Sequence, residues 1–438
     1  MALKIILFSL AFLLFSACST KDITLPPQDI NLYTQESLLI NTKNLKDSYL
    51  ESFFAPFKIK ENTKTKHIAW ALDMAYSTQG YGENLLPLKK EEIQLLESEA
   101  NYNNFPNSKL KYAIVAHSSN LRALPTNKPF FKNPNKAGEG FPFDYFQNSY
   151  IYANTPIIIK HYSQSKAWAF VESGFVSGWI ESKNIAYLNK AQLEKYKNIK
   201  NFIIPKNDYI ELKSNDRFLE YARVGMILPV YKNKILIFTR DENGNAKEKL
   251  IKINRDEFLN FPLNFSEHNY ALIANSIVGE KYGWGGMFGN RDCSMFLRDT
   301  FSNFGIYLPR NSQAQIKADT QGSKYYPLDK LNPQKKLDFI KKNAIPFATL
   351  LGLKGHIMLY IGEHNGEMLV LHDVWGLKMI QKETNNTSKE MRHIIGKIAI
   401  TQIDIGKNNS NIPQDSLFIN RIYGMLNLFE NGKIQEHE

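Results

Sequence analysis

The stretch YGWGGMFGNRDCSMFLRDTFSNFGIYLPRNSQAQ, residues 282–315, decides the fold of the C-terminal part of the chain. Its first half carries several glycines, which let the backbone turn sharply and let another segment approach closely. Apolar residues after Cys293 recur at helical spacing, and Gly305 and Pro309 then end the pattern. We therefore predict a helix with Cys293 in its first turn and Asp292 as its N-cap.

Cys293 is expected to be the only free thiol of the mature chain. The sequence contains two cysteines, and the other, Cys18, ends an N-terminal leader. A lone thiol cannot close an intrachain disulfide or build a cysteine-rich metal site. The partial positive charge at a helix N-terminus favours the thiolate, so one interpretation is a nucleophile with a pKa below the ordinary value of about 8.5. Inert packing is the other interpretation, because cysteine is among the most buried residue types.

Three motifs in order resemble the NlpC-type cell-wall peptidases, a papain-like family of cysteine peptidases. They are the run Y-G-W-G-G, then D-C-S at the head of a helix, then L-P-R-N-S-x-x-Q. In this family a histidine on a strand follows the cysteine, and a third polar residue lies on the next strand. GHIMLYIG places His356 at a strand start, and MLVLHDVWG places His372 at the end of another. The resemblance implies that Cys293, His356 and His372 are catalytic.

Two alternatives for the histidines remain open. His364 also follows His356, but it belongs to HNGE, residues 364–367, which predicts a hairpin turn between the two histidine-bearing strands. A zinc site made by Cys293 and two histidines is the second alternative, since all three are zinc ligands. The D-C-S sequence at a helix start favours a nucleophile, so we expect neither a metal nor a cofactor.

Substrate-binding residues follow only from the resemblance. In the family, residues that flank the nucleophile bind the free amino end of the substrate, which implies this role for Asp292 and Ser294. The lone pairs of one carboxylate suffice for this role and for the helix cap together. Tyr282 is similar to the family tyrosine near the developing oxyanion, and the N–H of Cys293 is the other expected donor. The residues expected to anchor the chain after the helix are Arg310 and Gln315.

The N-terminus carries a targeting signal, which we place at residues 1–17. Lys4 precedes an apolar run that is too short for a transmembrane helix, and small residues then precede Cys18. The string FSAC resembles the lipobox of bacterial lipoproteins, which implies acylation of Cys18, and Ser19 favours the outer membrane. An ordinary secretory peptide is the alternative. Residues 18–44 are polar without a clear period, so we expect a tether, and a periplasmic, lipid-anchored protein.

Changes of period divide the rest of the chain. Residues 45–110 show helical spacing interrupted by breakers and predict a small helical domain. Short β-type runs predict two small all-β barrels at 111–195 and 196–262, and AWAFVESGFVSGWIESKNIAYL resembles the last strands of bacterial SH3-like barrels. Residues 263–438 then form the papain-like domain. The predicted fold class is α+β, and this domain order is what the resemblance implies for a multidomain lipoprotein of the family, with the helical domain bordering the groove.

Length and composition exclude several classes of protein. A chain of 438 residues with 43% hydrophobic and 22% charged residues is globular and has several domains. The net charge is +11, but the lysines are interspersed with asparagine and glutamate and form no block. Zinc-finger spacing and recognition-helix patterns are missing from the sequence, so nucleic acid is not an expected partner. The expected partners are peptidoglycan stem peptides or muropeptides and, through the lipid, a membrane; we expect a monomer.

The resemblance implies an endopeptidase that cuts wall peptides after γ-linked D-glutamate and before the diamino acid. Two other functions remain open, namely an inactive wall-binding lipoprotein and an amidase or acyltransferase on the same fold. Intact Cys293, His356 and His372 argue against an inactive relic. The barrels and the wall-facing compartment favour a peptide substrate over another acyl acceptor.

Overall fold

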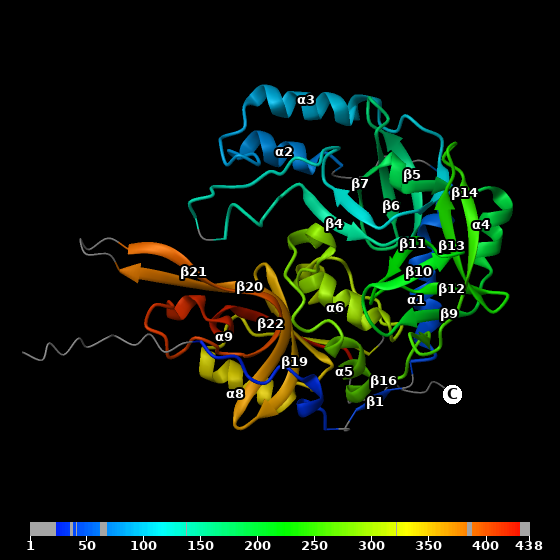
Figure 1. The fold of residues 1–438 in the computed structure, drawn as a ribbon. Helices are drawn as coiled ribbons and strands as arrows, with labels where there is room; N and C mark the ends of the chain where they lie inside the picture. The colour runs from blue at the N-terminus through cyan, green and yellow to red at the C-terminus, as the bar shows by residue number, and fades with distance from the viewer. Residues whose placement is uncertain are drawn as a thin grey trace, which may run out of the picture.

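The structure is a computed structural model, and it describes residues 23–35, 38–40, 42–61, 68–136, 138–320, 322–382 and 388–429. The predicted signal peptide and Cys18 lie outside the described residues. Figure 1 shows the C-terminal domain below and to the left of two small β-domains, with two helices along the top. Within the described part of the chain, no helix is long and apolar enough to cross a membrane.

The prediction of a tether is wrong from residue 23 onward, because the described residues of this segment pack against the C-terminal domain. The amide of Gln28 donates to the carbonyl of Ile400 at 3.0 Å and accepts from its N–H at 2.9 Å. Strand β1 (Leu39–Ile40) pairs antiparallel with β16 (Phe265–Ser266). The sequence concealed this packing, because the buried side chains have no regular spacing; they are Ile30, Tyr33, Leu38 and Ile40.

The predicted helical domain divides into two parts. Its elements are α1 (Leu45–Phe53), η2 (Ala55–Lys58), α2 (Trp70–Ser77), α3 (Lys90–Ala100) and η3 (Tyr102–Asn104), after the short η1 (Ile30–Tyr33). Tyr49 of α1 packs in one core with Tyr196 and Phe238 of the second β-domain. Helices α2 and α3 lie side by side at the top of Figure 1 and pack on the first β-domain. Helix α1 therefore packs on one β-domain and the pair α2 and α3 on the other, so the helices do not form a single unit.

The first β-domain is a seven-stranded antiparallel sheet in the order β4-β3-β7-β6-β5-β2-β8. Alternating apolar residues of its strands form one core, which is why the short β-type runs were visible in the sequence. The connection between β3 and β4, residues 123–146, reaches toward the C-terminal domain (Figure 1). The strands are β2 (Lys111–Val115), β3 (Ser119–Arg122), β4 (Gln147–Ile151), β5 (Pro156–Tyr162), β6 (Trp168–Ser173), β7 (Ser177–Glu181) and β8 (Ile185–Tyr187), with η4 (Ser182–Asn184).

The second β-domain begins with α4 (Lys190–Lys197), which Asn189 caps. Its main sheet has the order β14-β13-β12-β9-β15, and β10 and β11 form a separate hairpin. The hairpin predicted at ENGN is confirmed by the pairing of Arg240 with Ala246. The strands are β9 (Phe202–Pro205), β10 (Ile210–Ser214), β11 (Arg217–Ala222), β12 (Leu228–Tyr231), β13 (Lys234–Arg240), β14 (Ala246–Lys252) and β15 (Phe258–Asn260).

The C-terminal domain is built on a six-stranded sheet in the order β17-β22-β18-β19-β20-β21. Helices α5 and α6 pack on one face of this sheet, and α8 and α9 pack on the other. The helical elements are α5 (Glu267–Asn275), η5 (Trp284–Gly289), α6 (Cys293–Ser302), α7 (Ser312–Gln315), α8 (Pro333–Asn343), η6 (Gln414–Ser416) and α9 (Phe418–Arg421). The strands are β17 (Lys324–Pro327), β18 (Thr349–Leu353), β19 (His356–His364), β20 (Glu367–Lys382), β21 (Ser388–Gln402) and β22 (Ile422–Asn427).

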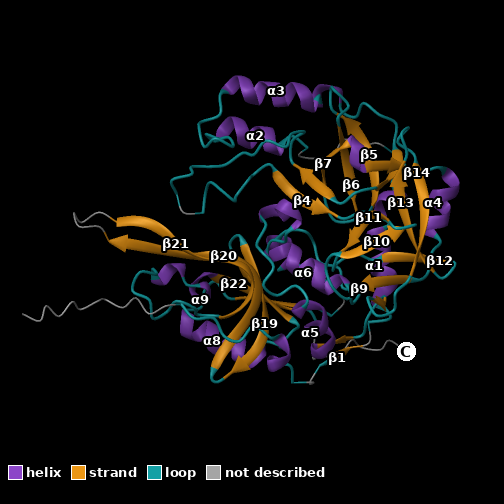
Figure 2. Cartoon of the chain, viewed as in Figure 1, coloured by secondary structure: helices purple, strands orange, loops and turns teal. Residues whose placement is uncertain are grey.

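His356 begins β19, as predicted, whereas His372 lies inside β20 and not at the end of its strand. The HNGE turn is confirmed by the pairing of His364 with Glu367. Strands β20 and β21 are much longer than predicted, and Figure 2 shows that they leave the sheet as a two-stranded arm. The sequence did not indicate this arm, because the polar residues within 388–393 interrupt the alternation of apolar and polar residues that predicts a half-buried strand.

Candidate active site

Cys293 is the first residue of α6, and Asp292 is its N-cap, as predicted. The Asp292 carboxylate accepts from the N–H of Met295 at 2.8 Å. Cys293 is 6% exposed, and the N–H of Ile357 donates to its sulfur. Because Ile357 directly follows His356 on β19, the thiol lies against the start of the strand that carries the predicted base.

His356 and His372 form a hydrogen-bonded pair. Nε2 of His356 lies 2.8 Å from Nδ1 of His372, and Nε2 of His372 lies 3.1 Å from the hydroxyl of Thr401. That hydroxyl donates to the carbonyl of Gln402, so it accepts from His372. His372 Nδ1 must then accept from His356 Nε2–H, which leaves Nδ1 of His356 with a free lone pair. In this arrangement Nδ1 of His356 is able to accept a proton, and His372 fixes the orientation of the His356 ring through its hydrogen bond.

Both imidazoles are neutral in this structure. Burial lowers the pKa of His356 to about 3, and Arg421 adds to this effect while Asp292 opposes it. Burial also lowers the pKa of His372 well below its usual value, and the neighbouring His356 reinforces the shift. A neutral His372 is what the hydrogen-bond chain requires, because this ring accepts at Nδ1 and donates at Nε2.

The sequence-based expectation of a low thiol pKa is wrong for this state of the protein. Burial raises the pKa of the Cys293 thiol, and the charge of Asp292 raises it further. The N–H of Ile357 lowers it, but burial outweighs this hydrogen bond. The resting pair is therefore a neutral thiol and a neutral imidazole, and a thiolate has to be made by proton transfer at the time of attack.

Asp292 has its hydrogen-bonding capacity filled within the protein. One oxygen accepts from the Met295 N–H and the Ser294 hydroxyl, and the other accepts from the N–H of Gly285 at 3.1 Å. Arg310 donates to both oxygens, at 3.1 and 2.8 Å. Burial alone would raise the pKa of this carboxyl, but Arg310 outweighs it and the pKa is lowered. The Asp292 carboxylate is therefore fully hydrogen-bonded within the protein and has no free lone pair for a substrate amine.

Arg310 does more than the chain-anchoring role expected of it. Besides Asp292, it donates to the hydroxyl of Ser294 at 2.9 Å and to that of Ser149, in the first β-domain, at 2.7 Å. Gln315 anchors the chain as expected, because its amide donates to the carbonyls of Ser294 and Pro309 at 2.7 and 2.8 Å. The D-C-S motif is thus fixed by residues that follow α6 in the sequence.

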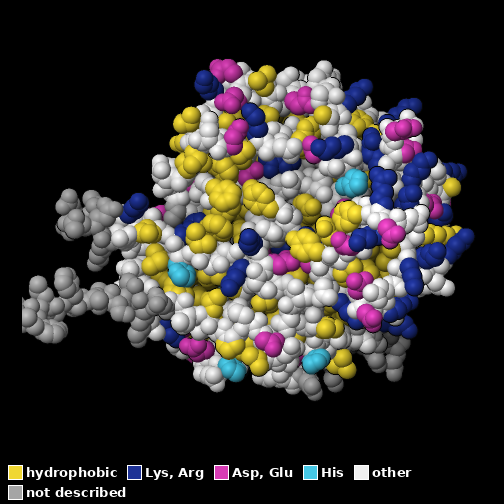
Figure 3. Space-filling view, in the orientation of Figure 1, with side chains coloured by type: hydrophobic (Ala, Val, Ile, Leu, Met, Phe, Trp, Pro, Cys, Tyr) yellow, Lys and Arg dark blue, Asp and Glu magenta, His cyan; other side chains and the backbone are white. Residues whose placement is uncertain are grey.

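Tyr282 stands beside the nucleophile in an aromatic wall that includes the first β-domain. Burial raises the pKa of its phenol well above the usual value, and the Asp292 carboxylate adds to this shift. Its ring lies 5.9 Å from that of Trp375, which lies 6.2 Å from Phe143. Figure 3 shows hydrophobic side chains gathered between the β3–β4 connection and the β20–β21 arm. The sequence did not single out Phe143, which lies outside the motifs, or Trp375, which follows His372 in MLVLHDVWG without a recognisable role there.

His364 lies away from this constellation. It occupies the hairpin turn, and its ring packs edge-on against Tyr33 at 5.2 Å. His372, and not His364, is the histidine that is hydrogen-bonded to His356. In the described part of the chain no group of three histidine, cysteine or acidic side chains could hold a metal ion.

Asp373 is a buried carboxyl that sequence reasoning missed. It is fully buried, and neither of its oxygens has a hydrogen-bond partner. It faces the Cys293 side of β20, where its ionised form would raise the pKa of both Cys293 and Tyr282. Burial and Asp292 in turn raise the pKa of Asp373 well above the usual value, so this carboxyl is protonated.

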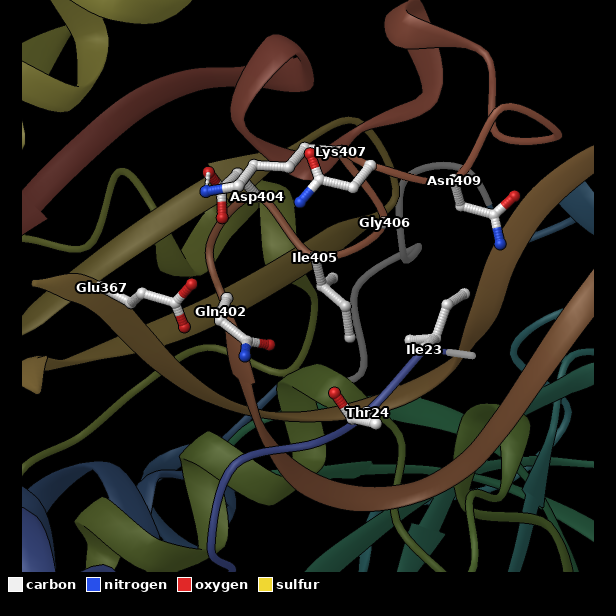
Figure 4. A pocket seen from close by; sticks show the side chains of 10 residues that line it. Ile23, Thr24, Glu367, Gln402, Asp404, Ile405, Gly406, Lys407 and Asn409 are labelled. Carbon is white, nitrogen blue, oxygen red and sulfur yellow. Dashed lines mark ion pairs between the residues drawn. The ribbon is translucent and has the colours of Figure 1, made fainter. Parts of the chain in front are cut away.

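A separate pocket of about 200 Å³ lies away from the nucleophile (Figure 4). It is lined by Ile23 and Thr24 of the N-terminal segment, by Glu367, and by the loop that contains Asp404 and Lys407. Lys407 and Asp404 form an ion pair at 2.8 Å. None of the predicted site residues lines this pocket.

Four family models match the chain. Residues 279–395 match the NlpC/P60 family, and residues 7–105 match the N-terminal stabilising domain of NLPC_P60 proteins. Residues 129–181 match an SH3 domain of SH3b1 type, and residues 189–234 match one of SH3b2 type. The predicted order of domains and the predicted resemblance are therefore confirmed.

The fold is shared with a solved structure. An NlpC/P60 endopeptidase from Photobacterium damselae subsp. piscicida is 27% identical in sequence, and the similarity covers 93% of this chain and 98% of that chain with a TM-score of 0.80. An NlpC/P60 family protein from Bacillus cereus is 15% identical over 64% of this chain and 81% of that chain, with a TM-score of 0.41. No curated protein matches the sequence.

Proposed function

We propose that this chain, which carries an NlpC/P60 domain behind an N-terminal stabilising domain and two SH3 domains, is a cysteine endopeptidase of peptidoglycan stem peptides that cuts between γ-D-glutamate and the diamino acid. The observation that carries this proposal is the hydrogen-bonded chain His356–His372–Thr401 beside Cys293 at the start of α6. A relic that only binds the wall would have no need to keep this chain of proton donors and acceptors intact.

The reaction proceeds through a thioester. The Cys293 sulfur attacks the γ-carbonyl carbon while its proton passes to Nδ1 of His356, and the oxyanion accepts from the N–H of Cys293 and the hydroxyl of Tyr282. His356 returns the proton to the amine of the diamino acid as the C–N bond breaks. Water then attacks the thioester and gives a proton to His356, and that proton returns to the sulfur as the free carboxylate leaves.

The walls of the site favour small fragments as substrates. Phe143 from the first SH3 domain and Trp375 from the β20–β21 arm approach each other beside Tyr282, and Arg392 of the arm lies 5.0 Å from the ring of Phe143. A nucleophile enclosed in this way accepts a slender peptide end more readily than a branched, cross-linked strand. We therefore propose that stem peptides with a free L-alanine amine are cut faster than peptides attached to muramic acid.

The location of the protein is part of the proposal. The sequence resembles a lipobox ending at Cys18, so we propose lipid attachment at that residue and a periplasmic position, at the outer membrane. Replacing Cys18 by alanine should release the protein from membranes and leave the cleavage of small muropeptides unchanged. Membrane association that persists in this variant would contradict the proposal.

A product map by mass spectrometry tests the function itself. Purified muropeptides are incubated with the protein and with a Cys293→Ala variant, and the new termini are identified. The proposal predicts a new γ-D-glutamate carboxylate and a new diamino acid amine with the wild type alone. Hydrolysis of the amide bond between the lactyl group of muramic acid and L-alanine would indicate an amidase. Transfer to an added amine without hydrolysis would indicate an acyltransferase, and no product from any muropeptide would indicate a binding protein.

A further inference from the structure

The side chain of Arg291, two residues before the nucleophile, is fully buried and uses every donor it has. Its Nε donates to Asp299 of α6 at 2.9 Å, and Nη1 donates to Glu280 at 2.6 Å. The remaining donors go to the second SH3 domain, to both oxygens of Asp208 at 2.7 and 2.9 Å and to the carbonyl of Val224 at 2.8 Å. Two partners of this guanidinium therefore come from another domain.

Asp208 is itself held by the second SH3 domain. It lies between β9 and β10, and its side chain is 3% exposed. It accepts from Nε of Arg223 and from the N–H of Val224, both at 2.6 Å. Arg223 also donates to the carbonyl of Gly289 at 2.9 Å, on the same loop as Arg291. The second SH3 domain therefore holds the segment before the nucleophile at two points.

The backbone of Arg291 connects these contacts with the second SH3 domain to both sides of the reaction centre. Its carbonyl accepts from the N–H of Gly283 at 2.6 Å, and Arg291 forms an isolated parallel β-bridge with Tyr282. On the other side, the next residue is Asp292, which caps α6 and sets the position of Cys293. A shift of the Arg291 side chain would therefore move Tyr282 and the nucleophile relative to each other.

We propose that Asp208 of the second SH3 domain is a positioning residue of the active site. It acts through Arg291 to fix the position of Cys293 relative to Tyr282. A buried ion pair is weak support for stability by itself, since desolvation offsets much of its attraction. Its position beside the nucleophile gives it a consequence for rate, because a small misplacement of reacting groups costs far more in turnover than in binding. The second SH3 domain is thus part of the catalytic unit.

The test compares Asp208→Asn with Tyr196→Phe in the full chain. Tyr196→Phe is the matched control, because it removes a buried hydrogen bond between the two SH3 domains, from Tyr196 to the carbonyl of Asn154 at 2.7 Å, away from the nucleophile. The inference rests on the proposed function for its first readout, the kcat and KM of muropeptide cleavage. We expect Asp208→Asn to lower kcat by roughly 10- to 100-fold at nearly unchanged KM, and Tyr196→Phe to leave both unchanged.

A second readout needs no substrate. The rate of Cys293 alkylation by iodoacetamide, measured against pH on folded protein, should change in Asp208→Asn and stay at the wild-type value in Tyr196→Phe. If the wild type cleaves nothing, the proposed function fails, and the alkylation profiles still decide the role of Asp208. Wild-type kcat and a wild-type profile in Asp208→Asn would overturn the inference. Should Asp208→Asn not fold, Arg223→Gln, which removes the contacts to Asp208 and Gly289, takes its place with the same expectations.

Discussion

The thiol of Cys293 is subject to two opposing physical effects. A helix N-terminus and the N–H of Ile357 stabilise the thiolate, whereas burial and the charge of Asp292 stabilise the thiol. Here burial prevails, because the sulfur is almost inaccessible to water and the imidazole of His356 is neutral. A substrate that displaces the surrounding groups would change this balance at the moment it is needed.

The first prediction follows from that balance. Iodoacetamide should alkylate Cys293 of the free protein only slowly at pH 6 to 8, and the rate should rise steeply above the ordinary thiol pKa of about 8.5. Mass spectrometry of the peptide that contains Cys293 measures this rate, with a small free thiol in the same solution as reference. Rapid alkylation at pH 6 would show that the thiolate is already formed in the resting protein.

A second prediction concerns the unpartnered carboxyl of Asp373. The pKa of Asp373 is higher in the folded protein than the value of about 3.9 in the unfolded chain. Below about pH 3.9 the carboxyl is protonated in both states and does not change the free energy of unfolding. As the pH rises above that value, the carboxyl ionises in the unfolded chain first, and this ionisation destabilises the folded protein. Asp373→Asn should therefore stabilise the protein at pH 7 by about 1 kcal/mol or more, because asparagine cannot ionise in the unfolded state and one unit of pKa difference corresponds to about 1.4 kcal/mol. The gain should shrink toward pH 4.

Denaturant unfolding at several pH values measures this effect. Asp319→Asn serves as the control, because Asp319 is exposed on the surface. An equal stability of Asp373→Asn and wild type across the whole pH range would mean that Asp373 finds a partner that satisfies its charge.

At the scale of elements, the site lies where α6, the start of β19, the β20–β21 arm and the β3–β4 connection meet. The arm and the connection touch through Trp375, Arg392 and Phe143, and Trp284 of η5 joins them by donating to the carbonyl of Asp144 at 2.9 Å. These contacts come from three separate parts of the sequence. They therefore restrict access to Cys293 only in the assembled fold.

The third prediction tests this restriction. Phe143→Ala removes the ring that lies between Trp284 and Trp375, 5.0 and 6.2 Å away. We expect kcat/KM for stem peptides attached to muramic acid to rise several-fold relative to that for free stem peptides. Phe141→Ala is the control, because Phe141 lies two positions earlier in the same connection and is 59% exposed. An unchanged ratio of the two substrates would show that the aromatic wall does not select them.

The elements also show what a sequence reveals and what it conceals. The α6 helix and the histidine strands could be predicted, because Asp292, the glycines and the apolar alternation are local signals. Thr401 could not be predicted, since its role depends on strand pairing that places β21 beside β20. The same holds for Asp208, whose partner Arg291 is distant in sequence, and for Asp373, whose environment exists only after the sheet has formed.

At the scale of the whole molecule, the domains share their cores. Val224 of the second SH3 domain and Ile30 of the N-terminal segment both belong to the core that contains Cys293. Leu259 of the second SH3 domain packs against that core and against the one shared with α1. The catalytic domain is therefore completed by segments that precede it in the chain.

The fourth prediction is that residues 264–438 do not form a stable domain alone. The fragment lacks the apolar side chains of the N-terminal segment, and its buried Arg291 loses Asp208 and the carbonyl of Val224. Breaking a buried charge pair costs roughly 3–5 kcal/mol, a large part of the stability of an ordinary domain. Circular dichroism against temperature should show a broad, low transition for the fragment, and a sharp transition near that of the full chain would contradict this view of the assembly.

The most direct test of the central claim is the mass of the intact protein, quenched in acid during turnover of a free stem peptide. The account predicts a covalent adduct of L-alanyl-γ-D-glutamyl mass on Cys293 in the wild type. It predicts neither adduct nor product in Cys293→Ala, and the loss of both in His356→Ala. Cleavage at the wild-type rate by Cys293→Ala, with no adduct at any time, would contradict the assignment of Cys293 as the nucleophile.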